Sequence, residues 1–262
     1  MSALSDSQVE HWGAYLFEAA TDGNAVQAIT ASVDLSTDDA YRIQANLVRR
    51  HLAAGDRVVG AKAGLTSLAK QVQMGVDSPI FGVITERMKV AVGDPVLVGT
   101  RIHPRCEPEI VFLMGDELSG DVDEGDVLDA TSAIHGGIEI IDSRYEKFSF
   151  TLPDVIADNT SASGFVIGSV ATSPRSLPLA DIRCVFGDPT AERVESSGAA
   201  LLGNPATCVV ELVRHLSRWG QSLPAGAWVL AGATTDAVPL TAGTTVRADF
   251  PDLDDTVTVN AR

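Results

Sequence analysis

The chain begins with apolar residues at helical spacing. Val9, Trp12 and Leu16 recur every three or four positions, which is the spacing of one face of an α-helix. Ser5 to Gln8 has the order S-x-x-Q, a capping-box pattern that predicts the first turn of this helix. Gly23 predicts its end, because glycine readily adopts the left-handed conformation that closes helices.

A second amphipathic pattern lies in the segment AYRIQANLVRRHLAA. Ile43, Leu47 and Val48 form its apolar stripe, with polar residues on the opposite side. The polar stretch Ser36 to Asp39 can cap this helix, and Gly55 stops it. The first part of the chain is therefore predicted to be helical.

From Arg57 onward the pattern changes. The run RVVGAKAG predicts a short strand that presents Lys62 among small and apolar neighbours. TSLAKQVQMG predicts a short helix with Thr66 as its N-cap and Gly75 as its stop. VDSPIFGVI then returns to extended structure after a turn.

Beyond residue 95 short runs rich in β-branched residues dominate, each bounded by Gly, Pro or Asp. The predicted strands are PVLVGTRI, EIVFLM, GIEIID, GFVIGSV, IRCVFG, AWVLAG, TTVRADF and DTVTVNA. Two predicted helices, DVLDATSAI and PATCVVELVRHLSRWG, interrupt them. This pattern favours an α+β fold with a rolled or barrel-like mixed-β core. We predict a helical N-terminal section over residues 1–56 and a mixed-β domain with the candidate chemistry over residues 57–262.

Composition and charge narrow the range of partners. The 262 residues are 45% hydrophobic and include 23 glycines, which is typical of a globular, turn-rich protein. The formal net charge is −16 and the pI is about 4.5. We expect no nucleic-acid partner and no anionic membrane surface, because both require clustered Lys and Arg.

The cysteines and the N-terminus indicate the compartment. Cys106, Cys184 and Cys208 are widely spaced, lack a CxxC pattern and lie mostly in apolar runs, so we expect buried free thiols. The N-terminus lacks the charged-then-apolar pattern of a signal peptide. No run of about 18 apolar residues is present to span a bilayer. A cytoplasmic protein is therefore expected.

The strongest candidate chemistry is a set of carboxylates in two apolar runs. Glu107 and Glu109 stand two apart at the start of EIVFLM, so on a strand they point to the same face. Glu139 lies among isoleucines in GIEIID, the next predicted strand. Together the three would form an oxygen triad suited to Mg²⁺ or Mn²⁺, with positions left open for water or substrate.

A plainer reading of the same residues remains open. An E-x-E pair is also common as two solvated carboxylates on an exposed strand face. The apolar flanks of all three acids favour burial, where ionised carboxylates need compensation. Gly136 and Gly137 before Glu139 would let backbone or a ligand approach closely.

Other polar residues leave alternatives open. Lys62 is either a surface lysine with a buried stem or a cation that stabilises an enolate or binds a substrate carboxylate. The polar stretch from Asp158 to Ser161 in IADNTSASGF is explained by turn and cap chemistry, or by a hydroxyl that faces the site. The chain has no GxSxG, P-loop or GxGxxG pattern, so serine hydrolase and nucleotide-binding classes lack support.

Several long sequence segments together resemble one family. They are GAKAGLTSLAKQVQMGVDSPIFG, HPRCEPEI, EIIDSRYEKFSF, VIADNTSAS and AGATTDAVPLTAGTTV. From about residue 35 onward the chain resembles the 2-keto-4-pentenoate hydratase and 4-oxalocrotonate decarboxylase group of the fumarylacetoacetate hydrolase superfamily. AKQVQMGVDSPIFG and IDSRYEKFSF are closer to the decarboxylases of that group.

The resemblance implies the fold of that superfamily and a divalent metal, usually Mg²⁺ or Mn²⁺, held by Glu107, Glu109 and Glu139. It also implies that Lys62 reaches the substrate. The other site residues that it implies are the catalytic candidates Asp77 and Ser161, and Leu65, Gln71 and Thr235 as substrate-binding residues.

The implied activity is decarboxylation of a small 2-oxo dicarboxylate, 4-oxalocrotonate (2-oxohex-3-enedioate), in the meta-cleavage catabolism of aromatic compounds. The alternative is the hydratase, which adds water to 2-hydroxypenta-2,4-dienoate. More distant alternatives are a carbon–carbon hydrolase of an acylpyruvate and a non-enzymatic β-rich binding domain. Members of the group commonly form homo-oligomers, and the decarboxylases associate with a cognate hydratase.

Overall fold

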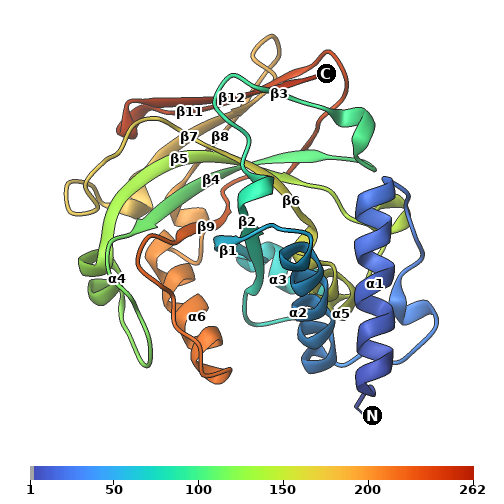
Figure 1. The fold of residues 1–262 in the computed structure, drawn as a ribbon. Helices are drawn as coiled ribbons and strands as arrows, with labels where there is room; N and C mark the ends of the chain where they lie inside the picture. The colour runs from blue at the N-terminus through green and yellow to red at the C-terminus, as the bar shows by residue number, and fades with distance from the viewer. Residues whose placement is uncertain (1–2) are drawn as a thin grey trace.

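The structure of the protein is a computed structural model that describes residues 3–262. A curled sheet forms its centre, a second sheet lies on one side of it, and helices cover the other side (Figure 1). The helices are α1 (Asp6–Asp22), α2 (Thr37–Ala53), α3 (Leu68–Met74), α4 (Glu124–Ala130), α5 (Leu152–Ala157) and α6 (Pro205–Arg218). Within the described residues, none of these helices is both long enough and apolar enough to cross a membrane.

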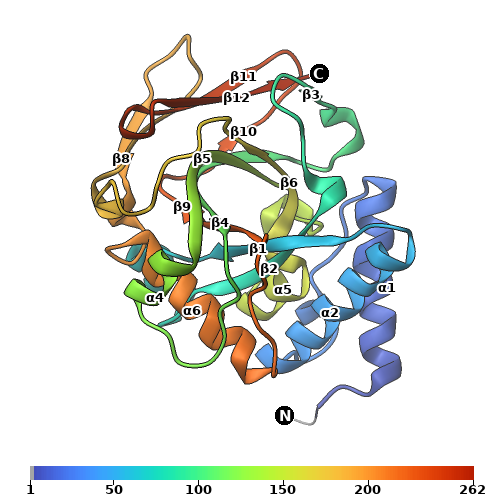
Figure 2. The same cartoon turned by 60° about the vertical axis from the view of Figure 1, so that its left-hand side comes forward.

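The larger sheet has the strand order β2-β1-β9-β4-β5-β6, with β10 also paired to β4. Its strands are β1 (Val58–Gly64), β2 (Ile80–Thr85), β4 (Arg105–Met114), β5 (Thr131–Ile141), β6 (Ala162–Ile167), β9 (Trp228–Ala233) and β10 (Val238–Pro239). The long strands β4 and β5 bend, so that the sheet curls into a half-barrel (Figure 2). This confirms the predicted α+β fold with a rolled mixed-β core.

The second sheet has the order β3-β12-β11-β7-β8. Its strands are β3 (Pro95–Val96), β7 (Arg183–Gly187), β8 (Val194–Ser197), β11 (Thr245–Phe250) and β12 (Asp255–Ala261). The main hydrophobic core lies between this sheet and the back of β4 and β5, and it extends to α6. Phe250, for example, packs against Gly136 of β5 so closely that a Cβ there would lie 2.3 Å from the ring.

The N-terminal helices share a separate core with a later part of the chain. Leu16 and Ile43 pack in one cluster with Tyr145 and Ile156, from the segment that follows β5. The hydroxyl of Tyr145 is buried and donates a hydrogen bond to the carbonyl of Asp154, at 3.0 Å. The helical section is therefore packed onto the mixed-β part. The boundary at residue 56 stays a prediction.

Most predicted helix ends are confirmed. Ser5 caps α1 with a full capping box, Ser36 caps α2, and Gly23 and Gly75 end their helices in the left-handed conformation. The three cysteines are free and buried, as expected.

Three local predictions are wrong. The N-cap of α3 is Ser67, whose hydroxyl accepts from the backbone of Lys70, and not Thr66. The helix predicted over DVLDATSAI ends at Ala130, because the residues from Thr131 onward pair with β4. PVLVGTRI forms only the short β3 and then a turn of 3₁₀-helix. Long-range strand pairing and cap geometry override the local pattern in these segments.

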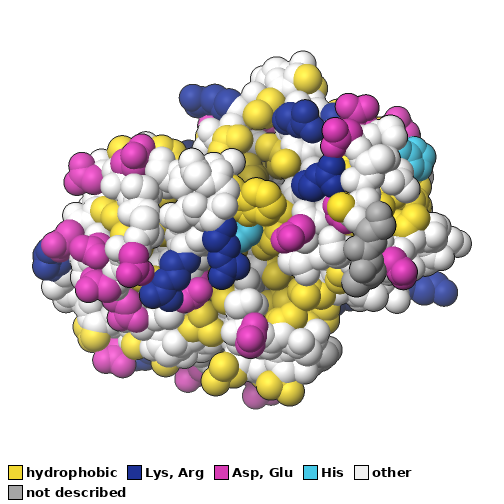
Figure 3. Space-filling view, turned by 90° about the horizontal axis from the view of Figure 1, so that it is seen from below, with side chains coloured by type: hydrophobic (Ala, Val, Ile, Leu, Met, Phe, Trp, Pro, Cys, Tyr) yellow, Lys and Arg dark blue, Asp and Glu magenta, His cyan; other side chains and the backbone are white. Residues whose placement is uncertain are grey.

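A groove of about 810 Å³ lies between α2, the start of β1 and α6. Tyr41, His215, Trp219 and Trp228 contribute to its lining. Figure 3 shows the molecule from below, where hydrophobic side chains lie between acidic and basic groups. The candidate carboxylates Glu107, Glu109 and Glu139 do not line this groove, and neither does Lys62.

Asp154 connects the two parts of the molecule and supports a stability prediction. Its carboxylate accepts from the backbone and hydroxyl of Thr30, at 2.9 and 2.6 Å, and from those of Thr151, at 2.9 and 2.7 Å. Asp154→Ala leaves these donors unpaired, so we expect the free energy of unfolding to fall by about 2–4 kcal/mol. Denaturant unfolding measures this, with exposed Asp22→Ala as the control. Equal stability of the two variants would contradict this role of Asp154.

Candidate metal centre

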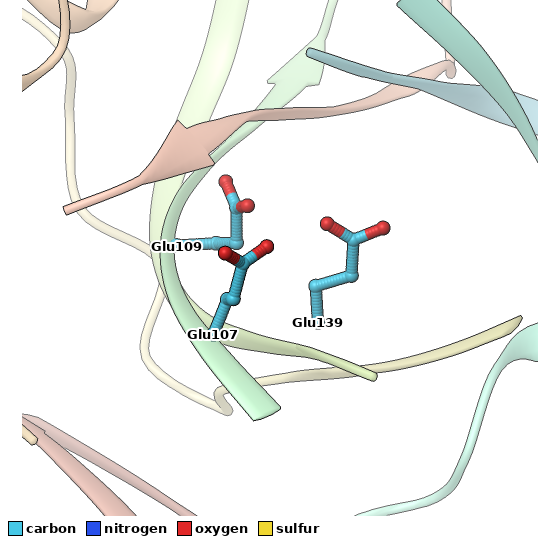
Figure 4. A group of neighbouring side chains, drawn as sticks. All are labelled: Glu107, Glu109 and Glu139. Carbon is cyan, nitrogen blue, oxygen red and sulfur yellow. The ribbon is translucent and has the colours of Figure 1, made fainter. Parts of the chain in front are cut away.

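The register of β4 and β5 brings the three predicted glutamates together. Glu107 is paired directly with Glu139, and Glu109 with Gly137. Because side chains two apart on a strand share a face, Glu109 lies beside Glu107 and across from Glu139. Figure 4 shows the three carboxylates converging on the inner side of the curled sheet. One oxygen from each lies within 4.8 Å of the others, and all three residues are buried.

The hydrogen bonding of these carboxylates is incomplete. The backbone N–H of Gly232 in β9 donates to Oε2 of Glu109, at 2.5 Å. Oε1 of Glu109 and Oε1 of Glu139 are buried and have no hydrogen-bond partner. Buried carboxylate oxygens are costly unless they are paired or coordinate a metal. Unpaired oxygens on converging carboxylates fit a hard divalent cation such as Mg²⁺ or Mn²⁺.

Lys62 is buried against the same carboxylates. Its Nζ lies 2.9 Å from Oε2 of Glu139, and both side chains are almost fully buried. The ammonium also donates to the carbonyl oxygen of Thr160, at 3.2 Å. β1 carries Lys62 and lies next to β9, which in turn pairs with β4. Lys62 is therefore not a surface lysine with a buried stem. Its role toward the substrate stays a prediction.

Burial also sets the protonation behaviour of the centre. Burial raises the pKa of Glu139 to about 7, although the charge of Lys62 opposes this. Burial, followed by the charge of Glu139, holds the pKa of Glu109 well above its ordinary value. For Lys62, burial lowers the pKa, but the charges of the three glutamates outweigh this and raise it. The centre can therefore hold protons near neutral pH that a metal ion would displace.

The other predicted site residues differ in their burial and in their hydrogen-bond partners. A hydrogen bond connects Leu65 and Gln71: the side-chain amide of Gln71 donates to the carbonyl of Leu65, at 2.9 Å. Ser161 is buried, and its hydroxyl lies 3.4 Å from Oδ2 of Asp158. Asp77 is exposed in the turn after α3, and the hydroxyl of Thr235 donates to the carbonyl of Asp236. Their roles stay predictions.

Three further contacts at the centre were not anticipated. Nζ of Lys70 on α3 lies 3.2 Å from Oε1 of Glu107. The other two are made by backbone groups, the N–H of Gly232 and the carbonyl of Thr160. Lys70 stands beside the predicted site residue Gln71 in the segment AKQVQMG, and this position could have identified it as a site residue. Backbone groups have no such signal in the sequence.

Named relatives cover almost the whole chain. A 4-oxalocrotonate decarboxylase from a Pseudomonas species is 40% identical over 238 residues, which are 91% of this chain and 92% of that protein. A 2-hydroxypent-2,4-dienoate hydratase from Pseudomonas putida is 35% identical over 220 residues, 83% of this chain and 99% of the relative. No family model matches the chain.

Solved structures agree with these relatives. The 4-oxalocrotonate decarboxylase from Pseudomonas putida G7, complexed with magnesium and adipate, has a TM-score of 0.96 and 32% identity, over 100% of both chains. A fumarylacetoacetate hydrolase from psychrophilic Exiguobacterium antarcticum shares the fold, with a TM-score of 0.60 and 15% identity over 79% of this chain and 76% of that one. The chain therefore belongs to the family of 4-oxalocrotonate decarboxylases and 2-keto-4-pentenoate hydratases, within the fumarylacetoacetate hydrolase superfamily.

Proposed function

We propose that this protein decarboxylates 4-oxalocrotonate to 2-hydroxypenta-2,4-dienoate in the meta-cleavage catabolism of aromatic compounds. The observation that carries the proposal is the buried convergence of Glu107, Glu109 and Glu139 with Lys62 against them. The decarboxylase of the same fold that is complexed with magnesium and adipate, a six-carbon dicarboxylate, supports it.

In this proposal Glu107, Glu109 and Glu139 hold Mg²⁺ or Mn²⁺, since their donor set and unpaired oxygens fit such an ion. When bound, the ion supplies a Lewis acid for the 2-oxo acid end of the substrate. No Schiff base is required.

The reaction breaks the bond between C5 and C6 of the substrate. Its electron pair moves through the conjugated chain to the oxygen on C2, CO₂ leaves, and that oxygen then takes a proton. Lys62 places a positive charge in a buried site where negative charge develops, and such an arrangement stabilises the transition state strongly. Leu65, Gln71 and Thr235 are proposed to line the substrate pocket, and Asp77 and Ser161 to assist catalysis.

The hydratase is the second candidate, because a 2-hydroxypent-2,4-dienoate hydratase is 35% identical to the chain. The decarboxylase is favoured by the relative at 40% identity and by the word IDSRYEKFSF. The family resemblance also supports a homo-oligomer and a complex with a cognate hydratase as proposals.

A substrate assay separates the two candidates. Purified protein and Mg²⁺ are incubated with 4-oxalocrotonate and, separately, with 2-hydroxypenta-2,4-dienoate. We expect ultraviolet absorbance loss and CO₂ release from the first, and no consumption of the second. Consumption of the second compound alone would overturn the decarboxylase proposal in favour of the hydratase.

Loss of one carboxylate should remove metal binding. In Glu139→Gln the centre loses one charged ligand, and we expect Mg²⁺ affinity to fall by about 100-fold or more, since even outer-shell changes cost about 10–100-fold. Calorimetric titration of Mg²⁺ into metal-free protein measures this. The control is Glu117→Gln, which changes an exposed glutamate away from the centre. Unchanged affinity and turnover in Glu139→Gln would exclude the metal centre.

Metal binding should also depend on pH. In the metal-free protein the pKa of Glu139 is raised to about 7, so the carboxyl carries a proton at pH 6 and is ionised at pH 8. A metal ion must expel that proton at the lower pH. We therefore expect Mg²⁺ affinity to fall by up to about tenfold per pH unit below 7, with proton release. Calorimetry in buffers of different ionisation enthalpy tests this, and a pH-independent affinity without proton release would refute it.

A further inference from the structure

Three consecutive residues after α5 have left-handed backbone conformations, although none is glycine. The φ angles of Asn159, Thr160 and Ser161 are 51°, 51° and 60°. This region is unfavourable for most residues and most of all for a β-branched one such as Thr160. Such conformations persist only where surrounding contacts hold them, and they concentrate at functional sites. We refer to residues Asn159–Ser161 as the left-handed turn.

Specific hydrogen bonds hold the left-handed turn at both ends. The side-chain amide of Asn159 pairs with the backbone of Val83 in β2: Oδ1 accepts from its N–H and Nδ2 donates to its carbonyl, each at 2.8 Å. At the other end, the carbonyl of Ser161 accepts from the N–H of Asp142, just after β5, at 2.9 Å. The turn is therefore fixed to β2 and to the residue that follows β5.

The position opposite Lys62 is kept free for the turn. Lys62 of β1 is paired with Gly82 of β2. A Cβ at Gly82 would lie 2.3 Å from the hydroxyl of Thr160 and 2.8 Å from the carbonyl oxygen of Asn159. Only glycine lets the turn lie this close to β2. At this position the carbonyl of Thr160 accepts the hydrogen bond from Lys62.

We propose that the left-handed turn positions Lys62 for catalysis, with Asn159 and Gly82 as the positioning residues. The inference rests on the proposed role of Lys62 as the cation of the reaction. A lysine side chain is long and flexible, so an ion pair with Glu139 alone leaves its ammonium several orientations. A Glu139 carboxylate that also binds a divalent cation attracts the ammonium less. The carbonyl of Thr160 is neutral and keeps its hydrogen bond in either state.

The test replaces the anchor and keeps the backbone freedom. Asn159→Gly still allows a positive φ but loses both hydrogen bonds to Val83. We expect kcat to fall by about 10–100-fold, as for a small misplacement of a catalytic group, with KM little changed. Mg²⁺ affinity, measured by calorimetry with the metal alone, should stay within about threefold, because the three glutamates are not altered. The matched control is Asp254→Gly, at an exposed residue with φ 52° in the turn between β11 and β12.

A second pair of variants makes the test independent of Asn159. Gly82→Ala displaces the turn from β2 and should lower kcat in the same way. Gly99→Ala is its control, since a Cβ there meets no atom within 4 Å. Values of kcat equal to those of the controls would overturn the inference. A parallel loss of Mg²⁺ affinity would also overturn it, by showing that the turn supports the carboxylates and not Lys62.

Lys62→Ala separates this inference from the proposed function. If Lys62→Ala is nearly inactive while Asn159→Gly and Gly82→Ala match their controls, only the positioning role fails. If Lys62→Ala retains normal activity, the cation role and the positioning role both fail, and a loss of kcat in Asn159→Gly is then assigned to Ser161, which lies in the turn.

Discussion

The candidate metal centre requires three carboxylates to lie in a buried space where they repel one another. Glu107, Glu109 and Glu139 have oxygens within 4.8 Å of each other, and burial withdraws the water that would screen them. β4 and β5 can hold this arrangement because each is paired on both sides and packed from behind by the main core. The nearby positive groups, Lys62 and Lys70, offset part of the negative charge, and the raised pKa values of Glu109 and Glu139 allow bound protons to offset more of it.

The parts of the centre that the sequence predicted are those that depend on local spacing. Residues two apart on a strand point to the same face in any fold, so the prediction that Glu107 and Glu109 lie side by side was correct. The position of Glu139 opposite them depends on the register between β4 and β5. The apolar residues beside Glu139 predicted that it lies in a buried strand, but they did not predict this register. The end of α4 was predicted too late for the same reason. The helix stops where the chain begins to pair with β4, and this pairing is long-range. The carbonyl of Thr160 was invisible, since any residue supplies a carbonyl.

In the proposed function, one shared centre would account for the decarboxylase and hydratase names among the relatives of this chain. In both proposed reactions negative charge develops at the 2-oxo acid end of the substrate. The two substrates differ at the opposite end, where one has a carboxylate and the other does not. If both reactions use this centre as proposed, the choice between them depends on residues that face that end, and not on Glu107, Glu109 and Glu139.

The ion pair between Lys70 and Glu107 has a consequence for how the protein takes up metal. Lys70 is carried by α3, a helix of seven residues whose Leu68 and Val72 are largely exposed. Without metal, this lysine is a built-in counterion that neutralises part of the charge in the centre. In the proposed function, an ion held by Glu107 takes the place of this contact, so that metal uptake exchanges one cation for another. An arriving ion must compete with an amine tethered to the protein, which is present at a constant effective concentration whatever the metal supply of the cell.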